Sequence, residues 1–359
     1  MKNKPFANTH EQIKTQTNVL AKSIKLGIDV HADSYRVVRQ IDNATPQPAQ
    51  KFTPEKFLVW AKKQLTQAEV VYSCYEAGPF GYVLHRQLEE MGIQNVVVRP
   101  QNWDELGKGV KTDKTDALAL VLRLDRHVQG NRKALAVITV PTPEQEQARA
   151  QARHREQLRK DRQVHEAQGR SQMLLLGVRV TGAWWKERFW KILQPELPAW
   201  AVAILENLRQ LILLADGLVE QTTTALENQA KPQPKGFGAL TSQVLEAEVL
   251  DWHRFRNRRQ VASLTGMCPG VRASGLKSIN GSITKHGNPR LRCALIELAW
   301  RVVRYQPDYR PVIRWRAVLA QKTNRGARKK AIVAIGRRLA IDIWRIQTGR
   351  CTPDKLGLI

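Results

Sequence analysis

The chain is poor in cysteine and in long apolar runs. Its four cysteines among 359 residues, Cys74, Cys268, Cys293 and Cys351, show no C-x-x-C spacing, so we expect neither a zinc knuckle nor a disulfide framework. No run approaches the roughly 20 apolar residues of a membrane span. The polar amino terminus lacks the apolar segment of a secretory signal. These absences predict a folded cytoplasmic protein with reduced thiols.

Acidic residues are scarce relative to basic ones, above all in the last third of the chain. The sequence holds 58 Lys and Arg against 32 Asp and Glu, a net charge of +26. Between Arg254 and Arg350 there are 23 basic residues and three acids, a balance of +20. An excess of this size is typical of proteins that bind polyanions, so we expect a nucleoid-associated protein. Charge alone also fits a ribosome-associated or membrane-surface protein.

The first part of the chain alternates between strand and helix patterns. Two β-branched runs joined by His-Ala-Asp predict a hairpin. Strands are expected at residues 24–30, 34–41, 69–76 and 93–100, and helices at 54–67 and 81–91. A hairpin followed by alternating strands and helices predicts an α/β sheet domain.

The middle of the chain is predicted to be helical. Residues 141–170 open with prolines and continue in strong helix formers. A second helix carries apolar residues at alternating spacings of three and four, an a/d seam, made of Leu205, Leu208, Ile212, Ala215, Val219, Thr222 and Leu226. That seam needs a partner, either the preceding helix or a second subunit. The tryptophans near these helices are expected to anchor packing; they are Trp184, Trp185, Trp190 and Trp200.

A break rich in proline and glycine at 228–240 marks the start of a last domain. There we expect a loop over 271–290 and helices at about 290–305 and 326–346. The predicted domains are a lead at 1–23, a catalytic domain at 24–135, a helical linker at 136–230 and a DNA-binding domain at 231–359.

Four carboxylates stand at positions that suit a shared site. Asp113 and Asp116 in "KTDKTDA" lie three apart, on one face if the segment is helical. Taken alone, they also fit the start of a helix, whose positive end favours acids. Asp29 lies near the carboxyl end of one predicted strand, and Glu76 lies at the comparable position of another strand of the same sheet. Four acids that raise each other's pKa are poor for stability, whereas two divalent ions would relieve the repulsion and serve phosphodiester chemistry.

Several stretches resemble one family of enzymes. "GIDVHADSY", "YEAGPFGYVLHRQL", "KTDKTDA" and "LTGMCPGVRASG…KHGNPRLRCAL" are similar to the DEDD transposases of the insertion-sequence 110 and 1111 families. The resemblance implies the class α/β plus α: a RuvC-like ribonuclease-H-fold domain, a helical coiled-coil middle and a mostly helical transposase domain. It also implies that Asp29, Glu76, Asp113 and Asp116 bind Mg²⁺, or Mn²⁺.

The same resemblance implies a serine nucleophile, which corresponds to Ser274 in "RASGLKS". The loop is less serine-rich than the family's, so Ser278 stays a second candidate. Lys277, Lys285 and Arg290 are candidates for binding the scissile phosphate, although in so basic a region each also fits general DNA contact.

The implied partners are donor and target DNA, a guide RNA encoded by the element, and further copies of the chain in a dimer or tetramer. No RNA-binding signature is visible in the sequence. Two other functions stay open: a RuvC-like DNA junction endonuclease in which water attacks, and a non-catalytic protein that binds nucleic acid. We also predict that the middle helices pair between subunits, which would bring Ser274 of one chain near the carboxylates of another.

Overall fold

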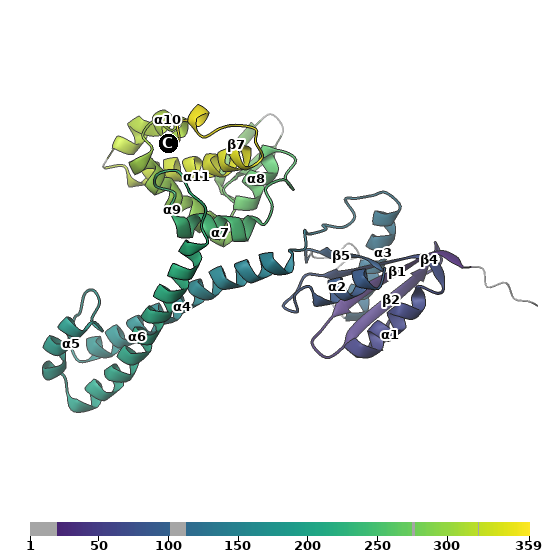
Figure 1. Cartoon of the computed structure of the whole chain (residues 1–359), viewed down its shortest axis with the longest axis horizontal. Helices are drawn as coiled ribbons and strands as arrows, with labels where there is room; N and C mark the ends of the chain where they lie inside the picture. Colours follow the sequence, from purple (N-terminus) through teal and green to yellow (C-terminus); the bar gives the residue numbers. More distant parts are fainter. Residues whose placement is uncertain (1–19, 101–112, 275–276, 322) are drawn as a thin grey trace, which may run out of the picture. The chain divides into compact units, whose positions relative to one another are not determined.

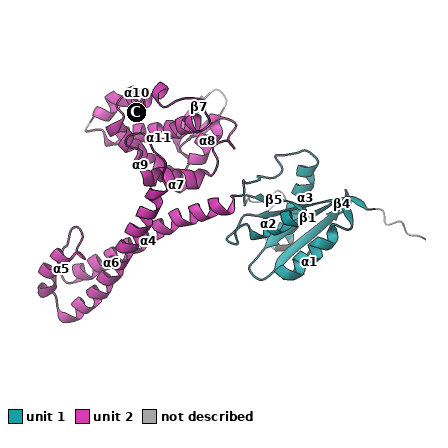
Figure 2. Cartoon of the chain, viewed as in Figure 1, with its two compact units in different colours: residues 1–140 teal, residues 141–359 magenta. Residues whose placement is uncertain are grey.

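A computed structural model describes residues 20–100, 113–274, 277–321 and 323–359 of the chain. The chain divides into two compact units, residues 1–140 and 141–359 (Figure 2). Most of the predicted lead, 1–23, lies outside the described residues. The predicted helical linker and DNA-binding domain both fall within unit 2, and their status as separate domains stays a prediction.

Unit 1 is built on a five-stranded mixed sheet in the order β3-β2-β1-β4-β5 (Figure 1). The strands are β1 (Ala21–Val30), β2 (Tyr35–Ile41), β3 (Gln50–Phe52), β4 (Ala68–Glu76) and β5 (Gln94–Val98). β1, β2 and β3 pair antiparallel, whereas β4 lies parallel to β1 and β5 parallel to β4. Consecutive residues of a strand face opposite sides of the sheet, and both sides are covered.

Helices cover the two faces of this sheet. α1 (Pro54–Gln64) and α2 (Val83–Glu90) supply apolar side chains to a core that contains Ile24, Leu26 and Ile28 of β1. The third described helix of the unit, α3 (Asp113–Val128), packs on the opposite face through two smaller clusters. The sheet is therefore closed on both sides, and α3 is the element that lies over the candidate site.

The α/β class predicted for this part is confirmed, and so is the opening hairpin. The prediction missed β3, whose three residues carry no apolar alternation. The unit also extends past the predicted boundary at 135, because Ile138 donates its N–H to the Val97 carbonyl and adds to the sheet edge. The RuvC-like assignment stays a prediction.

A pair of long helices opens unit 2. α4 (Pro143–Leu175) starts with a capping box between Thr142 and Gln145, and α6 (Ala199–Asn228) follows the short α5 (Glu187–Leu193). Arg155 of α4 donates to Thr223 of α6, and Arg162 of α4 pairs with Asp216 farther back along α6. The two helices therefore run antiparallel, and α4 was correctly predicted as a long helix.

The predicted a/d seam of α6 is occupied within the chain. Leu205 and Ile212 are buried in one cluster with Met173 of α4. Trp184, Trp185 and Trp190 belong to the same cluster, which confirms their packing role. Trp200 does not, since 58% of its surface is exposed. The seam meets the preceding helix of the same chain, so pairing between subunits would need other residues.

The rest of unit 2 is a helical body with one hairpin. Its described helices are α7 (Ala239–Val249), α8 (Arg258–Thr265), α9 (Pro289–Tyr305), α10 (Arg310–Ala320) and α11 (Arg325–Gln347). The expected helices at 290–305 and 326–346 are confirmed by α9 and α11. The expected loop over 271–290 is wrong in its first half, because β6 (Pro269–Ser274) and β7 (Lys277–Ile283) form an antiparallel hairpin. Residues 271–274 alternate between apolar and polar side chains, but this run of four exposed residues between two glycines was too short to predict a strand.

Glu248 of α7 joins three helices of unit 2. Its carboxylate accepts hydrogen bonds from Arg153 of α4 at 3.0 and 3.1 Å and from Asn288, the N-cap of α9, at 2.6 Å. Burial by itself would raise the pKa of Glu248, but these hydrogen bonds and the nearby arginine charges outweigh it and hold the pKa below its usual value. The ionised carboxylate therefore stabilises the fold.

The substitution Glu248→Gln is expected to reduce the free energy of unfolding by about 2–3 kcal/mol, the contribution of hydrogen bonds to a charged group. For a unit of this size that lowers Tm by roughly 5–10 °C, measurable by calorimetry. The control Glu220→Gln, on the exposed side of α6, should change stability by less than about 0.5 kcal/mol.

The same variant gives a pH test. Because the pKa of Glu248 is lower in the folded state, its stabilising effect is fully present above the pKa of the unfolded state, near 4.3. The effect is lost as the pH falls through the pKa of the folded state. The Tm difference between wild type and Glu248→Gln should therefore narrow below about pH 4. A difference that stays constant down to pH 3 would contradict this account of Glu248.

Candidate active site

Asp29 is the penultimate residue of β1, and Glu76 is the last residue of the adjacent parallel strand β4. The register of β1 and β4 pairs Ile28 with Tyr75, so the next residues, Asp29 and Glu76, come side by side. Partners in a parallel pair face the same way, and side chains alternate along a strand. Both carboxylates therefore lie on the face opposite Ile28, which is the face that α3 covers. The two strand-end acids are brought to one edge, as predicted.

Two contacts fix α3 on this face. Gly27 allows close packing, because a Cβ there would lie 2.3 Å from the Ala117 carbonyl oxygen of α3. Lys25, two residues before Gly27 in the middle of β1, pairs with Asp125 near the end of α3 at 2.5 Å. The helix thus runs antiparallel to β1, and its first turn, with Asp116, lies toward the strand end that carries Asp29.

The surroundings of these acids are partly buried and polar. Asp29 Oδ2 lies 3.1 Å from Nε2 of His31, and the Asp29 side chain is 21% exposed. His31 stands in the "GIDVHADSY" stretch, but no pattern in the sequence assigned it a role. Burial first, and next the charge of Glu76, raises the pKa of the Cys74 thiol well above its usual value. Cys74 therefore stays protonated and is no nucleophile.

The carboxylates do not form a closed metal site in the part of the chain that the structure describes. Among these residues, no three His, Cys, Asp or Glu side chains are grouped so as to hold a metal ion. The side chain of Asp113, the fourth predicted ligand, lies outside the described atoms, although its backbone begins α3. The structure thus places Asp29, Glu76 and the first turn of α3, with Asp116, toward one edge of the sheet, and metal binding by the four acids stays a prediction.

Ser274 is the last residue of β6, the first strand of the exposed hairpin in unit 2. Its backbone partner on β7 is Lys277, and the neighbouring pair is Ala273 with Ser278. Ser274 is exposed. The side chains of Lys277 and Ser278 lie outside the described atoms, so the choice between the two serines is open. The hairpin presents both candidate serines on one short β-ribbon.

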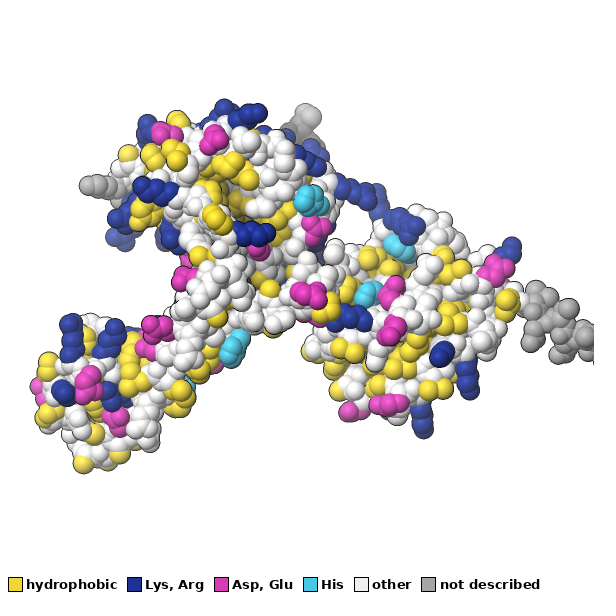
Figure 3. Space-filling view, in the orientation of Figure 1, with side chains coloured by type: hydrophobic (Ala, Val, Ile, Leu, Met, Phe, Trp, Pro, Cys, Tyr) yellow, Lys and Arg dark blue, Asp and Glu magenta, His cyan; other side chains and the backbone are white. Residues whose placement is uncertain are grey.

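Two further predicted phosphate ligands follow the hairpin. Lys285 is exposed and has a positive φ of 57°, which is uncommon for a side chain other than glycine. Arg290 of α9 donates from Nε to Glu156 of α4 at 2.6 Å. Arg290 therefore joins α9 to α4, and its role toward nucleic acid stays a prediction. Figure 3 shows many other Lys and Arg side chains over the part of unit 2 that carries α10.

Comparison with known proteins gives a consistent set of relatives. The family described as "Transposase IS116/IS110/IS902 family" matches residues 233–313. The putative transposase y4rJ of Sinorhizobium fredii is 31% identical over 298 residues, which cover 75% of this chain and 75% of that protein. The transposase for insertion sequence element IS1111A of Coxiella burnetii is 27% identical over 291 residues, 74% of this chain and 76% of that protein.

These similarities define the class of protein as a transposase. More particularly, the chain belongs to the IS116/IS110/IS902 transposase family, and the resemblance seen in the sequence is confirmed. Membership supports a function in transposition and an enzymatic activity on DNA strands. Among the described helices, none combines the length and the apolar composition that crossing a bilayer requires.

Proposed function

We propose that this transposase cuts and rejoins DNA strands through the carboxylates Asp29, Glu76, Asp113 and Asp116 and the nucleophile Ser274. The observation that carries the proposal is the placement of Asp29 and Glu76 side by side on the face covered by α3, with Asp116 in the first turn of that helix. Two neighbouring carboxylates at one sheet edge, with a third acid in the helix that covers that face, suit a site that binds cations better than they suit packing.

The donor set fits a divalent ion by its chemistry, because Mg²⁺ and Mn²⁺ prefer carboxylate oxygens. Asp29, Glu76, Asp113 and Asp116 would hold the ion or ions. Bound there, such ions would polarise the phosphate and stabilise charge on the attacking and leaving oxygens. The neighbouring His31, in contact with Asp29, would orient that carboxylate.

Ser274 would supply the covalent step. Its hydroxyl gives up a proton, a bond forms between Oγ and phosphorus, and the bond from phosphorus to one bridging sugar oxygen breaks, with that oxygen leaving as a hydroxyl after taking up a proton. The phosphoserine ester keeps the bond energy. A hydroxyl of another strand can then attack the ester and release the serine, which rejoins DNA without an external energy source.

Basic residues and partner molecules complete the proposal. Lys277 and Lys285 would bind phosphates near Ser274, with Arg290 as a third candidate. A guide RNA encoded by the element would pair with donor and target DNA. A RuvC-like junction endonuclease would use the same carboxylates with water as the nucleophile, and would work without Ser274. A protein that only binds nucleic acid would need neither the carboxylates nor the serine.

An exposed stripe on α6 supports assembly into dimers or tetramers. The stripe consists of apolar side chains that face away from the buried seam, Trp200, Ile204, Leu211, Leu214 and Leu218, and each is at least 36% exposed. Their spacings of three, four or seven residues follow a second a/d pattern. A second copy of the chain would cover this stripe, since handling several DNA strands together requires more than one active site.

Mixing two inactive variants tests whether subunits share sites. If Ser274 of one chain acts with the carboxylates of another, one of the two composite sites in a mixed dimer carries neither change. A mixture of Ser274→Ala and Asp29→Ala chains should then regain roughly a quarter to a half of the wild-type rate of strand exchange. Strand exchange on labelled element ends is the measurement. Mixed oligomers that form and stay fully inactive would count against sharing.

A further inference from the structure

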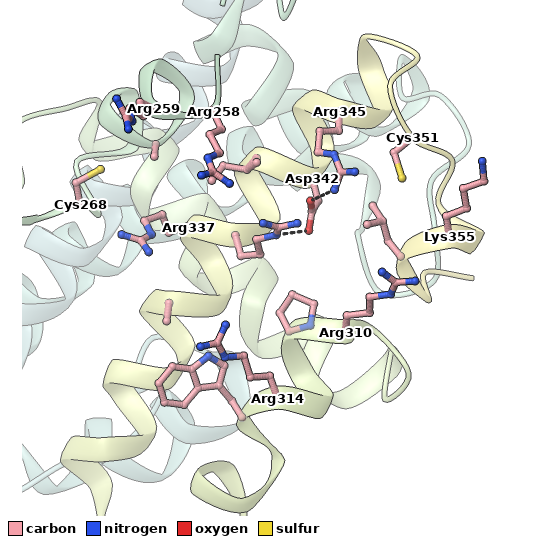
Figure 4. Close-up of a pocket in the computed structure, with 17 residues that line it drawn as sticks. Arg258, Arg259, Cys268, Arg310, Arg314, Arg337, Asp342, Arg345, Cys351 and Lys355 are labelled. Carbon is pink, nitrogen blue, oxygen red and sulfur yellow. Dashed lines mark hydrogen bonds and ion pairs between the residues drawn. The ribbon is translucent and has the colours of Figure 1, made fainter.

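A basic pocket lies in unit 2. The helices that surround it carry none of the candidate site residues named above. It has a volume of about 850 Å³ and is lined by residues of α8, α10 and α11 and of the carboxyl-terminal segment (Figure 4). Six of its cations make no ion pair with any described acid: Arg258, Arg259, Arg310, Arg314, Arg337 and Lys355. Such a concentration of unpaired positive charge is unfavourable unless an anion joins it.

Asp342, the acid among the described residues that line the pocket, does not neutralise these cations. Asp342 has 1% of its side chain exposed and pairs with Arg338 at 2.9 Å and with Arg345 at 3.2 Å, while Tyr309 donates its hydroxyl to the same carboxylate at 3.0 Å. The Asp342 carboxylate is thus used up in holding two further arginines at the pocket wall. The same contacts hold α11 against Tyr309 at the start of α10, so this wall of the pocket is preorganised.

Helical spacing directs the free arginines into the same space. Arg310 and Arg314 stand four apart on α10, and Arg337 lies on the same face of α11 as Arg345, eight residues later. Arginine presents a planar fork of donors that matches two oxygens of a phosphate. The lining also includes Trp315, a half-buried aromatic ring on which a base could stack.

We propose that this pocket binds the sugar-phosphate backbone of a nucleic acid, over a stretch of more than one nucleotide. The pocket volume lies within the roughly 300–1,000 Å³ of sites that take ligands much larger than a single phosphate ion. The positive charge and the planar arginine side chains indicate a ligand with several phosphates. The proposal rests on the proposed function only in taking nucleic acid as that ligand. DNA and RNA share this backbone chemistry.

The double variant Arg314→Gln/Arg337→Gln removes two free cations and leaves Asp342 and its partners intact. We expect binding to weaken about tenfold or more near physiological salt, and the slope of log K against log salt to become shallower by about two, one for each lost phosphate contact. Fluorescence anisotropy would be measured on duplex DNA, single-stranded DNA and hairpin RNA of equal length. Loss on DNA alone or RNA alone would identify the source of the backbone.

The matched control is Lys329→Gln/Lys330→Gln, which makes the same charge change at exposed positions of α11 outside the pocket. Its affinity should fall no more than about threefold. Equal losses in both variants, or no loss in the pocket variant on any of the three probes, would overturn the proposal. This test measures binding and not strand transfer. Its result is therefore independent of whether the protein has the proposed transposase mechanism.

Native thiols give a second readout without any substitution. Cys268 and Cys351 line the pocket, whereas Cys293 is exposed on α9 outside it. The full chain would be labelled with maleimide, digested, and analysed by mass spectrometry of the cysteine peptides. With saturating nucleic acid, labelling of Cys351 should slow at least about fivefold and labelling of Cys293 should change less than twofold, because bound ligand would shield the pocket thiol and not the other. Equal slowing of both thiols, or of neither, would contradict the assignment.

Discussion

Replacing Glu76 with Gln is expected to reduce strand cleavage by about 10²–10⁴-fold, because carboxylates that hold a divalent ion account for several kcal/mol of transition-state stabilisation. The change keeps the shape of the side chain and removes only its charge. Glu76 ends β4 beside Asp29, on the face that α3 covers. The measurement is the single-turnover rate of cleavage on a labelled element end, with Mg²⁺ and with Mn²⁺.

The same strand offers a control. Glu69 lies near the other end of β4 and is exposed, so Glu69→Gln should cleave within about twofold of wild type, as surface substitutions usually do. Affinity for the DNA should be nearly unchanged in both variants, since neither removes a positive charge. A Glu76→Gln protein that cleaves at the wild-type rate would remove the carboxylate cluster from the mechanism.

Replacing Ser274 with Ala should abolish strand exchange, with a loss of at least about 10⁴-fold, because a covalent mechanism fails when its nucleophile is removed. Ser274 is exposed at the end of β6, so the fold should be unaffected and Tm unchanged. Exchange would be followed with two labelled duplexes in a gel assay that also detects simple nicking.

Two other serines of the hairpin separate the alternatives. Ser282 on β7 is exposed, and Ser282→Ala should exchange strands like wild type. Ser278→Ala tests the second candidate nucleophile. Nicking that persists in Ser274→Ala while exchange is lost would point to the junction-endonuclease mechanism with water as the nucleophile. Loss of exchange in Ser278→Ala alone would move the nucleophilic role to that residue.

The sheet and its strand-end acids could be predicted because buried strands leave a local signal. The runs ending at Asp29 and Glu76 are rich in β-branched residues, and the turn residues around them are distinct. Because β1 and β4 are adjacent and parallel, their carboxyl ends lie side by side at one edge of the sheet. A helix with Asp113 and Asp116 near the strand-end acids was expected, but the contacts that hold α3 there, at Gly27 and between Lys25 and Asp125, could not be predicted because they are tertiary.

Other features have only a weak or ambiguous local signal. The β6–β7 hairpin is exposed, and the alternating run in its first strand, Val271 to Ser274, is too short to predict a strand. The seam on α6 was visible, but a seam has the same spacing whether it meets a helix of the same chain or of another. The arginines of the basic pocket come from α10 and α11, which follow each other, and from α8, which lies far from both in the sequence, so charge counting located the region without locating the pocket.

Mapping the covalent DNA–protein adduct tests the central claim most directly. Wild-type protein would react with an element end and Mg²⁺, be quenched in denaturant, treated with nuclease and protease, and analysed by mass spectrometry. The account predicts a nucleotide joined through phosphate to the peptide that contains Ser274, and no such peptide from the Glu76→Gln protein. Complete strand exchange without any serine-linked nucleotide, or an adduct on a residue outside the β6–β7 hairpin, would contradict it.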